Sequence, residues 1–405
     1  MHLLSARNRS EFLAVPQLVR FTLAQGKDGS EAVLLIKSST LTLKYLLRLK
    51  RFCLVVLRIG AKWLVYGIQI DDDPEHPVVL WSLLEYDDEV DAMRALMAHP
   101  KCVLFLFNEL VANVAWGEVD IDLSDEPLRA LIESATLHPT DDMDALGEVS
   151  QRIEALHRGE LTPTDGHVLI LPDVRAWHPI TSHYITNRAS RSLISIFETD
   201  EGAQQEEIAL WLTDNLQPTG AVKNPQVHEL NKVRELSDLL LSHEYGTFLI
   251  ESKTLSVLAR EALPNRAKLS RDVIKRLRKA TSQLVGGVKN LRRGLRITDA
   301  EGREVEVERT KPPHVIVLVP DLTLLSEATE FGGDFIRESS KKSGGVFHIL
   351  DPKELLRIVQ AAEMISARGE TTTPIMAFDF YLMERFKRAV TSNTPNFGVL
   401  IRFED

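Results

Sequence analysis

The chain has little cysteine and no long apolar run. Its two cysteines, Cys53 and Cys102, both lie in apolar, strand-like stretches. They give neither a disulfide framework nor the paired ligands of a zinc module, and we interpret them as buried free thiols of a cytoplasmic protein. No apolar run reaches the roughly 18–20 residues that span a bilayer, and residues 1–12 lack the apolar segment of a secretory signal. The sequence therefore predicts a cytoplasmic protein without a membrane partner.

The net charge of −10 at first disfavours a nucleic-acid partner. The charge is uneven, however, because residues 260–296 hold twelve Lys or Arg and only two acids. A compact basic segment on an acidic protein is what local contact with phosphates requires. A solvated helix face is the alternative explanation for the same charges. The composition is otherwise that of a globular protein, and 405 residues suffice for two or three domains.

Residues 1–155 are expected to form a separate N-terminal α/β domain. Apolar, β-branched runs predict strands at 31–37, 52–70, 78–84 and 102–107, and the pattern of 87–99 predicts a helix. Residues 41–50 are expected to be helical, with Lys44, Arg48 and Lys50 outward, either as a basic face for a partner or as an ordinary amphipathic helix. This half has no catalytic motif, so its role, including any protein partner, stays open.

The acidic, turn-rich composition of 124–165 suggests a domain boundary, and we assign 156–191 as a connecting segment and 192–405 as a second domain. Within the second domain, Asp200 is expected to cap a helix. Ser270 is expected to cap another helix, over 270–286. Residues 295–298 and 305–309 are expected to form a hairpin. Residues 314–320 read as a buried strand and 397–403 as the last strand.

A hairpin in the second domain brings acidic residues together. Two apolar runs, 239–241 and 248–250, flank the polar loop 243–246. If these four residues form the turn, Leu241 faces Phe248 and Leu239 faces Ile250, and one step further along Asp238 faces Glu251. Opposed side chains lie roughly 4.5–5.5 Å apart at Cβ. Lys253 shares the face of Glu251, whereas Ser252 points away. Two carboxylates and an ammonium at a strand exit suit a divalent metal and a nucleophilic water.

These residues resemble the PD-(D/E)xK nuclease superfamily. Asp238 matches its first acid and Glu251-Ser252-Lys253 its triplet, although Ser237 replaces the proline. Such families also place a glutamate on a preceding helix, which Glu206 fits. A glutamine on a following helix is matched by Gln283. The resemblance covers about 195–320. It implies a mixed-sheet, restriction endonuclease-like α/β core flanked by helices, and a nuclease dependent on Mg²⁺ (or Mn²⁺) that acts on DNA in defence, restriction or repair.

The resemblance also implies roles for single residues. Asp238, Glu251 and the carbonyl of Ser252 would bind the metal, joined by Glu206 or by its neighbour Glu207. Lys253 would orient the water or offset charge on the phosphate. Gln283 would contact the water or a phosphate, or else is a plain surface residue. Residues expected to contact the nucleic-acid backbone are Arg271, Lys275, Arg278 and Lys279.

Two other functions stay open at this point. The chain could bind nucleic acid on a catalytically inactive nuclease-like fold, although the presence of Asp238, Glu251 and Lys253 disfavours that. It could also be an interaction module in which the hairpin acids are surface charges. Whether the substrate is DNA or RNA, and whether the chain forms a homo-oligomer, do not follow from the sequence.

Overall fold

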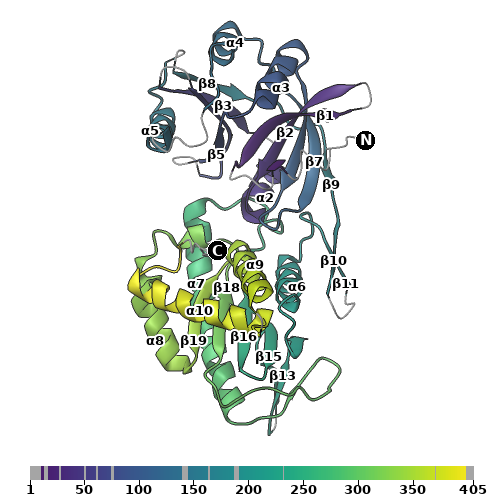
Figure 1. Cartoon of the computed structure of the whole chain (residues 1–405), viewed down its shortest axis with the longest axis vertical. Coiled ribbons are helices and arrows are strands. Elements are labelled where there is room, and N and C mark those ends of the chain that lie inside the picture. Colours follow the sequence, from purple (N-terminus) through teal and green to yellow (C-terminus); the bar gives the residue numbers. More distant parts are fainter. Residues whose placement is uncertain are drawn as a thin grey trace. The chain divides into compact units, whose positions relative to one another are not determined.

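The fold is described from a computed structural model of the chain (Figure 1). It describes residues 11–12, 17–26, 29–49, 52–60, 63–73, 77–138, 145–162, 165–186, 191–230, 232–369 and 371–397. The chain is a mixed α/β protein that divides into two compact units. The first unit comprises the described residues up to Ser182, with 195–197 and 261–265; the second comprises 183–194, 198–260 and the described residues from Arg266 onward.

The first unit is built on two sheets. One has the order β1-β2-β6-β7-β9 and the other β5-β4-β3-β8. Their strands are β1 (Val19–Gln25), β2 (Ser30–Lys37), β3 (Cys53–Ile59), β4 (Trp63–Ile70), β5 (Val78–Leu83), β6 (Lys101–Phe107), β7 (Asn113–Asp120), β8 (Gly166–Ile170) and β9 (Trp177–Pro179). The helices are α2 (Thr40–Leu49), α3 (Asp87–Ala98), α4 (Glu126–Glu133) and α5 (Ala145–His157). The segment 156–191, predicted as a connection, therefore supplies two strands of this unit. β8 pairs with β3, and β9 pairs with β7.

Of the side chains expected to point outward from residues 41–50, Arg48 is exposed as expected and Lys44 is not, so the described part of this helix carries no continuous basic face. Lys44 is buried, among the apolar residues of α2. Arg48 donates a hydrogen bond to the carbonyl of Glu261 at 3.1 Å. Lys50 lies outside the described residues. Helical periodicity alone could not show that the Lys44 side of α2 is covered by the rest of the unit.

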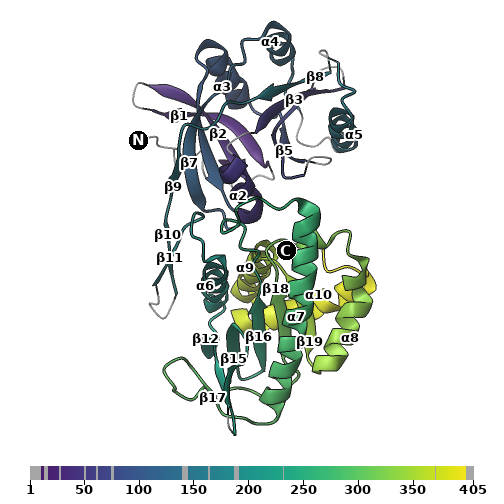
Figure 2. The same ribbon diagram turned by 180° about the vertical axis from the view of Figure 1, so that it is seen from behind.

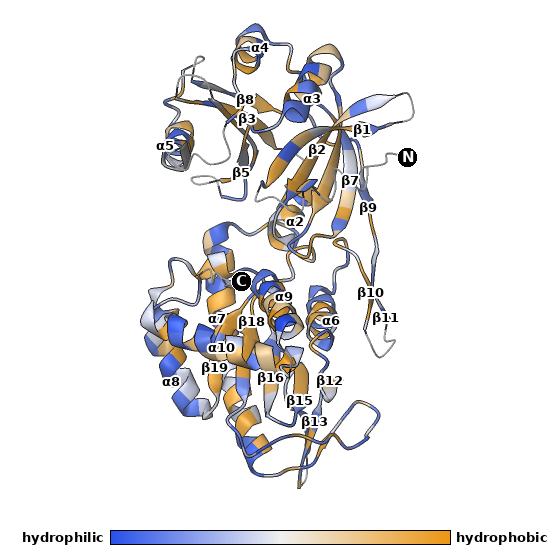
Figure 3. Ribbon diagram, in the orientation of Figure 1, coloured by the Kyte–Doolittle hydropathy of each residue, from blue (hydrophilic) through white to orange (hydrophobic). Residues whose placement is uncertain are grey.

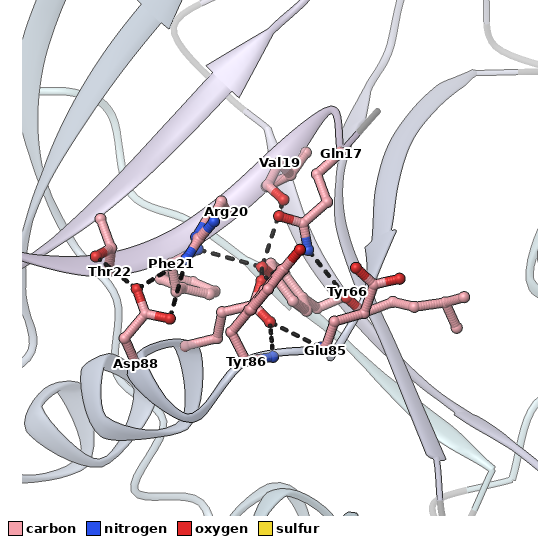
Figure 4. A network of polar contacts seen from close by, with 11 residues as sticks. Gln17, Val19, Arg20, Phe21, Thr22, Tyr66, Glu85, Tyr86 and Asp88 are labelled. Carbon is pink, nitrogen blue, oxygen red and sulfur yellow. Dashed lines mark hydrogen bonds and ion pairs between the residues drawn. The ribbon is translucent and has the colours of Figure 1, made fainter. Parts of the chain in front are cut away.

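A buried polar network joins the two sheets of the first unit (Figure 4). The Tyr66 hydroxyl, from β4, accepts a hydrogen bond from the backbone N–H of Phe21 in β1 at 3.2 Å and donates to Oε1 of Glu89 at 2.5 Å. Gln17 also donates to this oxygen, at 3.1 Å. The other Glu89 oxygen accepts from backbone N–H groups at the start of α3. One buried carboxyl group thus fixes β1, β4 and α3 together.

The second unit is organised around a five-stranded mixed sheet of order β12-β15-β16-β18-β19. Its strands are β12 (Gly220–Lys223), β15 (Leu239–His243), β16 (Gly246–Ser252), β18 (His314–Leu318) and β19 (Val346–Leu350). β12, β15 and β16 are antiparallel, whereas β16, β18 and β19 are parallel. Parallel neighbours require crossover connections, which α7 (Arg266–Arg292) and α8 (Gly333–Ser343) provide.

Helices cover both faces of this sheet. α6 (Glu201–Asp214), α9 (Pro352–Arg368) and α10 (Pro374–Thr391) pack together, and Figure 1 shows α9 and α10 in front of the strands. Figure 2, from behind, shows α7 in front of them. Strands covered on both faces are continuously apolar, and β18 is buried throughout, as its sequence predicted. Figure 3 shows this hydrophobic colouring along β15 and β18.

Several local expectations are wrong at the ends of elements. α7 begins at Arg266, so Ser270 lies inside it, and its hydroxyl donates to the carbonyl of Leu324 at 2.7 Å instead of capping the helix. The hairpin expected at 295–298 and 305–309 is confirmed only next to its turn, where Thr298 bridges Glu304 and the Val305 N–H donates to the Ile297 carbonyl at 2.9 Å. Beyond this point 306–309 is not a strand, and the Arg309 guanidinium donates to the carbonyls of Leu291 and Leu295. The Asp200 cap is confirmed. Most of the expected last strand, 397–403, lies outside the described residues.

Two small sheets complete the second unit. One has the order β14-β13-β17, with β13 (Gln226–Glu229), β14 (Lys232–Glu235) and β17 (Ile297–Thr298). The other is the hairpin of β10 (Ser182–Ile185) and β11 (Arg191–Ile194), whose first residue, Ser182, belongs to the first unit. β14 ends three residues before Asp238, and the chain then enters the main sheet as β15.

Candidate carboxylate and lysine site in the second unit

The hairpin register predicted from the turn length is confirmed. Leu241 pairs with Phe248, Leu239 pairs with Ile250, and the last pair before the turn is His243 with Gly246. Both strands are buried on both faces, so burial does not choose between registers, and the short turn between His243 and Gly246 fixes the register. The next pair outward is therefore Asp238 opposite Glu251.

The structure brings Asp238, Glu251 and Lys253 together. The Lys253 ammonium lies 2.6 Å from Oε1 of Glu251 and 3.7 Å from Oδ2 of Asp238. The same Asp238 oxygen accepts the backbone N–H of Ser252 at 2.5 Å. Glu251 is only 2% exposed. Burial, followed by the negative charge of Asp238, raises the pKa of Glu251 to about 7, against the effect of the nearby ammonium.

On α6, Glu206 rather than Glu207 lies beside this group. Burial and then the charge of Asp238 raise the pKa of Glu206. Burial would also raise the pKa of Glu207, but hydrogen bonds from Lys223 and Ser192 lower it overall. The Lys223 ammonium, at the end of β12, lies 3.4 Å from Glu206 Oε2 and 2.7 Å from Glu207 Oε1. Lys223 is thus a second ammonium of the site.

A further carboxyl group, Glu235 at the end of β14, was missed by the sequence analysis. Although the residue is exposed, partial desolvation and then the charges of Asp238 and Glu206 raise the pKa of its carboxyl group. Asn224, in a left-handed conformation with φ of 50°, donates its backbone N–H to the carbonyl of Asp238 at 2.9 Å. Its amide, oriented as a donor, lies 3.2 Å from Glu235 Oε1. No spacing in the sequence marks Lys223, Asn224 or Glu235, because β12 and β15 are paired only by the fold.

The site therefore holds more carboxyl groups than ammonium groups. The five carboxyl groups are Glu206, Glu207, Glu235, Asp238 and Glu251, and the two ammonium groups are Lys223 and Lys253. Like charges held close raise one another's pKa and favour the binding of a cation. Desolvation is the main cause of the raised pKa values of Glu206, Glu235 and Glu251, and the neighbouring carboxylates raise each of them further.

The chemistry of these donors fits a hard divalent cation, which prefers carboxylate and carbonyl oxygens. These oxygens already have partners within the protein, however. Glu251 binds Lys253, Asp238 binds the Ser252 N–H, and Glu206 binds Lys223. Consistent with this, the residues that the structure describes contain no group of three or more His, Cys, Asp or Glu arranged to hold a metal ion. A metal would have to displace the lysines.

The other predicted residues lie on α7. Arg271, Lys275, Arg278 and Lys279 are exposed, as is Gln283. Arg278 pairs with Glu330 at 3.3 Å and lies over the Phe331 ring. Within the described residues, no hydrogen bond joins Gln283 to the five carboxyl groups, so the structure does not bring it to the site. The chain after Lys253 is linked to α7, because Arg260 binds both the Leu255 carbonyl and Asp272.

Comparison with protein-family models, with curated proteins and with solved structures gives no match for this chain. Among the described helices, none is both long and apolar enough to cross a bilayer.

Proposed function

We propose that the second unit is a nuclease that depends on Mg²⁺ (or Mn²⁺) and hydrolyses phosphodiester bonds of DNA. The observation that carries the proposal is the convergence of Asp238, Glu251 and Lys253, with Glu206 beside them, where a buried hairpin ends. A mixed sheet with helices on both faces supports the resemblance to a restriction endonuclease-like core. Defence, restriction and repair all use this reaction, and we propose the reaction without choosing among them.

Asp238, Glu251 and the carbonyl of Ser252 would hold the divalent cation, and Glu206 would join them. Such a cation supplies Lewis-acid stabilisation of phosphate oxygens and makes a bound water more acidic. The protein's own contribution is to hold these oxygens in place. Asp238 is fixed by the Ser252 N–H, and Glu251 projects from a strand that is buried throughout.

Lys253 has two tasks in this proposal. While it is paired with Glu251 it neutralises a buried carboxylate. Once released from that pair, its ammonium offsets negative charge on the phosphate and orients the attacking water by donating a hydrogen bond. Lys253 lies one residue past β16, and its backbone N–H is bound to the Leu318 carbonyl at 2.8 Å, so the ammonium can leave Glu251 while the backbone stays in place.

The exposed basic face of α7 would bind the DNA backbone. α7 has 27 residues, which corresponds to about 40 Å at a rise of 1.5 Å per residue. Arg271, Lys275 and Lys279 recur along it at helical spacing and are exposed, as is Arg278. Phosphates bound there would neutralise a segment of strong positive charge in a chain that is acidic as a whole.

A second candidate is a nucleic-acid-binding or protein-interaction module on the same fold without catalysis. The closed ion pairs favour it, since Lys253 and Lys223 already satisfy Glu251, Glu206 and Glu207. On this alternative neither metal binding nor cleavage is expected.

The thermal stability of the full chain with and without Mg²⁺ or Mn²⁺ distinguishes the two functions. Metal should raise the melting temperature of the wild type, and Asp238→Asn should abolish the rise because a ligand charge is removed. Glu327→Gln, at an exposed glutamate on another loop, is the matched control and should respond like the wild type. An equal response in Asp238→Asn would contradict the metal site. Cleavage of duplex DNA, single-stranded DNA and RNA is assayed in parallel.

A further inference from the structure

α6 carries two buried polar residues that face the exit of β16. Gln205 and Glu201 are four residues apart, so they project from the same side of the helix. Each is only 7% exposed. The Gln205 amide donates a hydrogen bond to the carbonyl of Leu318, the last residue of β18, at 3.2 Å. Glu201 accepts the backbone N–H of Leu258 at 2.8 Å.

The Leu318 carbonyl is shared between α6 and Lys253. It accepts the backbone N–H of Lys253 at 2.8 Å in addition to the Gln205 amide. A carbonyl oxygen has two lone pairs, and here both are used. Lys253 lies just past the end of β16, so this bond is the last one that fixes its backbone. The helix that carries Glu206 and the residue that carries the ammonium are therefore bound to one atom.

The chain beyond Lys253 is held by the same helix. Leu258 lies five residues further on and is bound to Glu201 in the first turn of α6. Gly202 is not needed for the helix to approach the chain here, because a Cβ at that position would lie at an ordinary 3.7 Å from the Thr254 hydroxyl. The polar bonds of Gln205 and Glu201, rather than a steric constraint, set the position of α6 against the strand exit.

We propose that Gln205 is a positioning residue, which fixes α6 against the end of β18 so that Glu206 and Lys253 keep their relative position at the site. The expected effect of Gln205 on cleavage rests on the proposed nuclease function, whereas its expected effect on the structure around Lys253 does not. Gln205 touches neither the five carboxyl groups nor the two ammonium groups through any bond that the described residues show. It acts through the Leu318 carbonyl.

Two variants test the role. Gln205→Met keeps the length of the side chain and removes both hydrogen-bonding groups. Gln205→Glu keeps the shape, and at a pH above its pKa, which burial raises, the carboxylate cannot donate to the Leu318 carbonyl. Gln204→Met makes the same chemical change one residue away, on the part of α6 that is half-buried. If Gln205→Met does not fold, Gln205→Glu is judged by the same measurements.

The first measurement is hydrogen exchange of the peptide that contains Lys253, which does not depend on activity. Both Gln205 variants should lose protection there, and Gln204→Met should not. The second is cleavage kinetics. Displacement of reacting groups by about 1 Å costs roughly 10²-fold in rate, so kcat should fall by about that factor in the Gln205 variants. KM for DNA and the metal-induced rise in melting temperature should stay within twofold of the wild type.

The outcomes separate the two proposals. Unchanged protection at Lys253 in both Gln205 variants overturns the positioning role. A cleaving wild type with an unchanged kcat in these variants, or with a loss confined to KM, overturns it as well. Lost protection together with a wild type that does not cleave any substrate upholds the structural role of Gln205 and refutes the nuclease instead.

Discussion

Raising the pH from about 5 to 8 is expected to destabilise the first unit through one buried carboxyl group. Burial raises the pKa of Glu89 to about 7, although Tyr66 and the backbone N–H groups of Glu85 and Tyr86 donate hydrogen bonds that lower it. The group is completely buried. A protonated Glu89 would also have a hydroxyl to donate, and the Gln17 Oε1 beside it is buried without a partner in the described residues.

The sign and size of the effect follow from the two pKa values. Below about pH 4.5, the ordinary value, Glu89 is protonated in both the folded and the unfolded chain. Between that pH and about 7 the unfolded chain releases the proton and the folded chain keeps it, so the free energy of unfolding falls as the pH rises. Since each pKa unit corresponds to about 1.4 kcal/mol, the total loss is roughly 3 kcal/mol.

Tryptophan fluorescence can report the first unit alone. Of the five tryptophans, Trp211 belongs to the second unit and the other four to the first. Trp211→Phe in the full chain preserves an aromatic contact with Tyr184 and leaves only first-unit fluorophores. Urea unfolding of this protein is measured from about pH 5 to 8, with and without Glu89→Gln. The amide does not titrate, and it can still accept the two backbone N–H bonds.

The difference between the two proteins isolates Glu89 from all other ionisations. Across this range the free energy of unfolding of the protein with Glu89 should fall by roughly 3 kcal/mol relative to that of Glu89→Gln, mostly between about pH 5 and 7. A difference that is flat, or that rises with pH, would refute the reasoning. It would mean that the donors around Glu89 outweigh its burial and keep it ionised.

Other perturbations test the second unit. The pKa of His348 is held well below its ordinary value, mainly by burial and then by the charges of His314 and Arg385. Below about pH 6.5 the unfolded chain takes up a proton at this residue and the folded chain does not, so the free energy of unfolding of this unit should fall by up to about 1.4 kcal/mol per pH unit. Hydrogen exchange of β18 and β19 should show this loss in the wild type and not in His348→Gln. Lys275→Glu together with Arg278→Glu should weaken DNA binding and flatten its salt dependence; unchanged affinity would place the DNA elsewhere. Lys253→Met should enlarge the Mg²⁺-induced rise in melting temperature, because no ammonium then competes for its carboxylate partner, and a smaller rise would contradict this competition.

The sequence predicted the parts of the site that depend on local geometry. A short turn and a period of two fix which residues of a hairpin face each other, so Asp238, Glu251 and Lys253 were placed together correctly. The side of α6 was harder to predict. Glu206 and Glu207 are adjacent, and only the docking of the helix on the sheet decides that Glu206 lies beside Asp238.

The parts that were missed depend on contacts between distant segments. Lys223 reaches the site because β12 pairs with β15, and Gln205 binds the Leu318 carbonyl because α6 packs at the end of β18. Neither pairing has a local signal in the sequence. The burial of Lys44 has the same cause, because a charge that is outward on an isolated helix can be covered by the fold. Helix and strand ends were also misplaced where a side chain such as Arg309 binds backbone carbonyls.

Cleavage of DNA by the full chain with Mg²⁺, compared among the wild type, Lys253→Ala and Ser252→Ala, tests the central claim most directly. A group that stabilises charge in the transition state is commonly worth about 10²–10³ in rate, so Lys253→Ala should lose that much while still binding DNA. Ser252→Ala should cleave nearly normally, because only its backbone is used. A wild type that leaves DNA intact, or a Lys253→Ala protein that cleaves at the wild-type rate, would contradict the account.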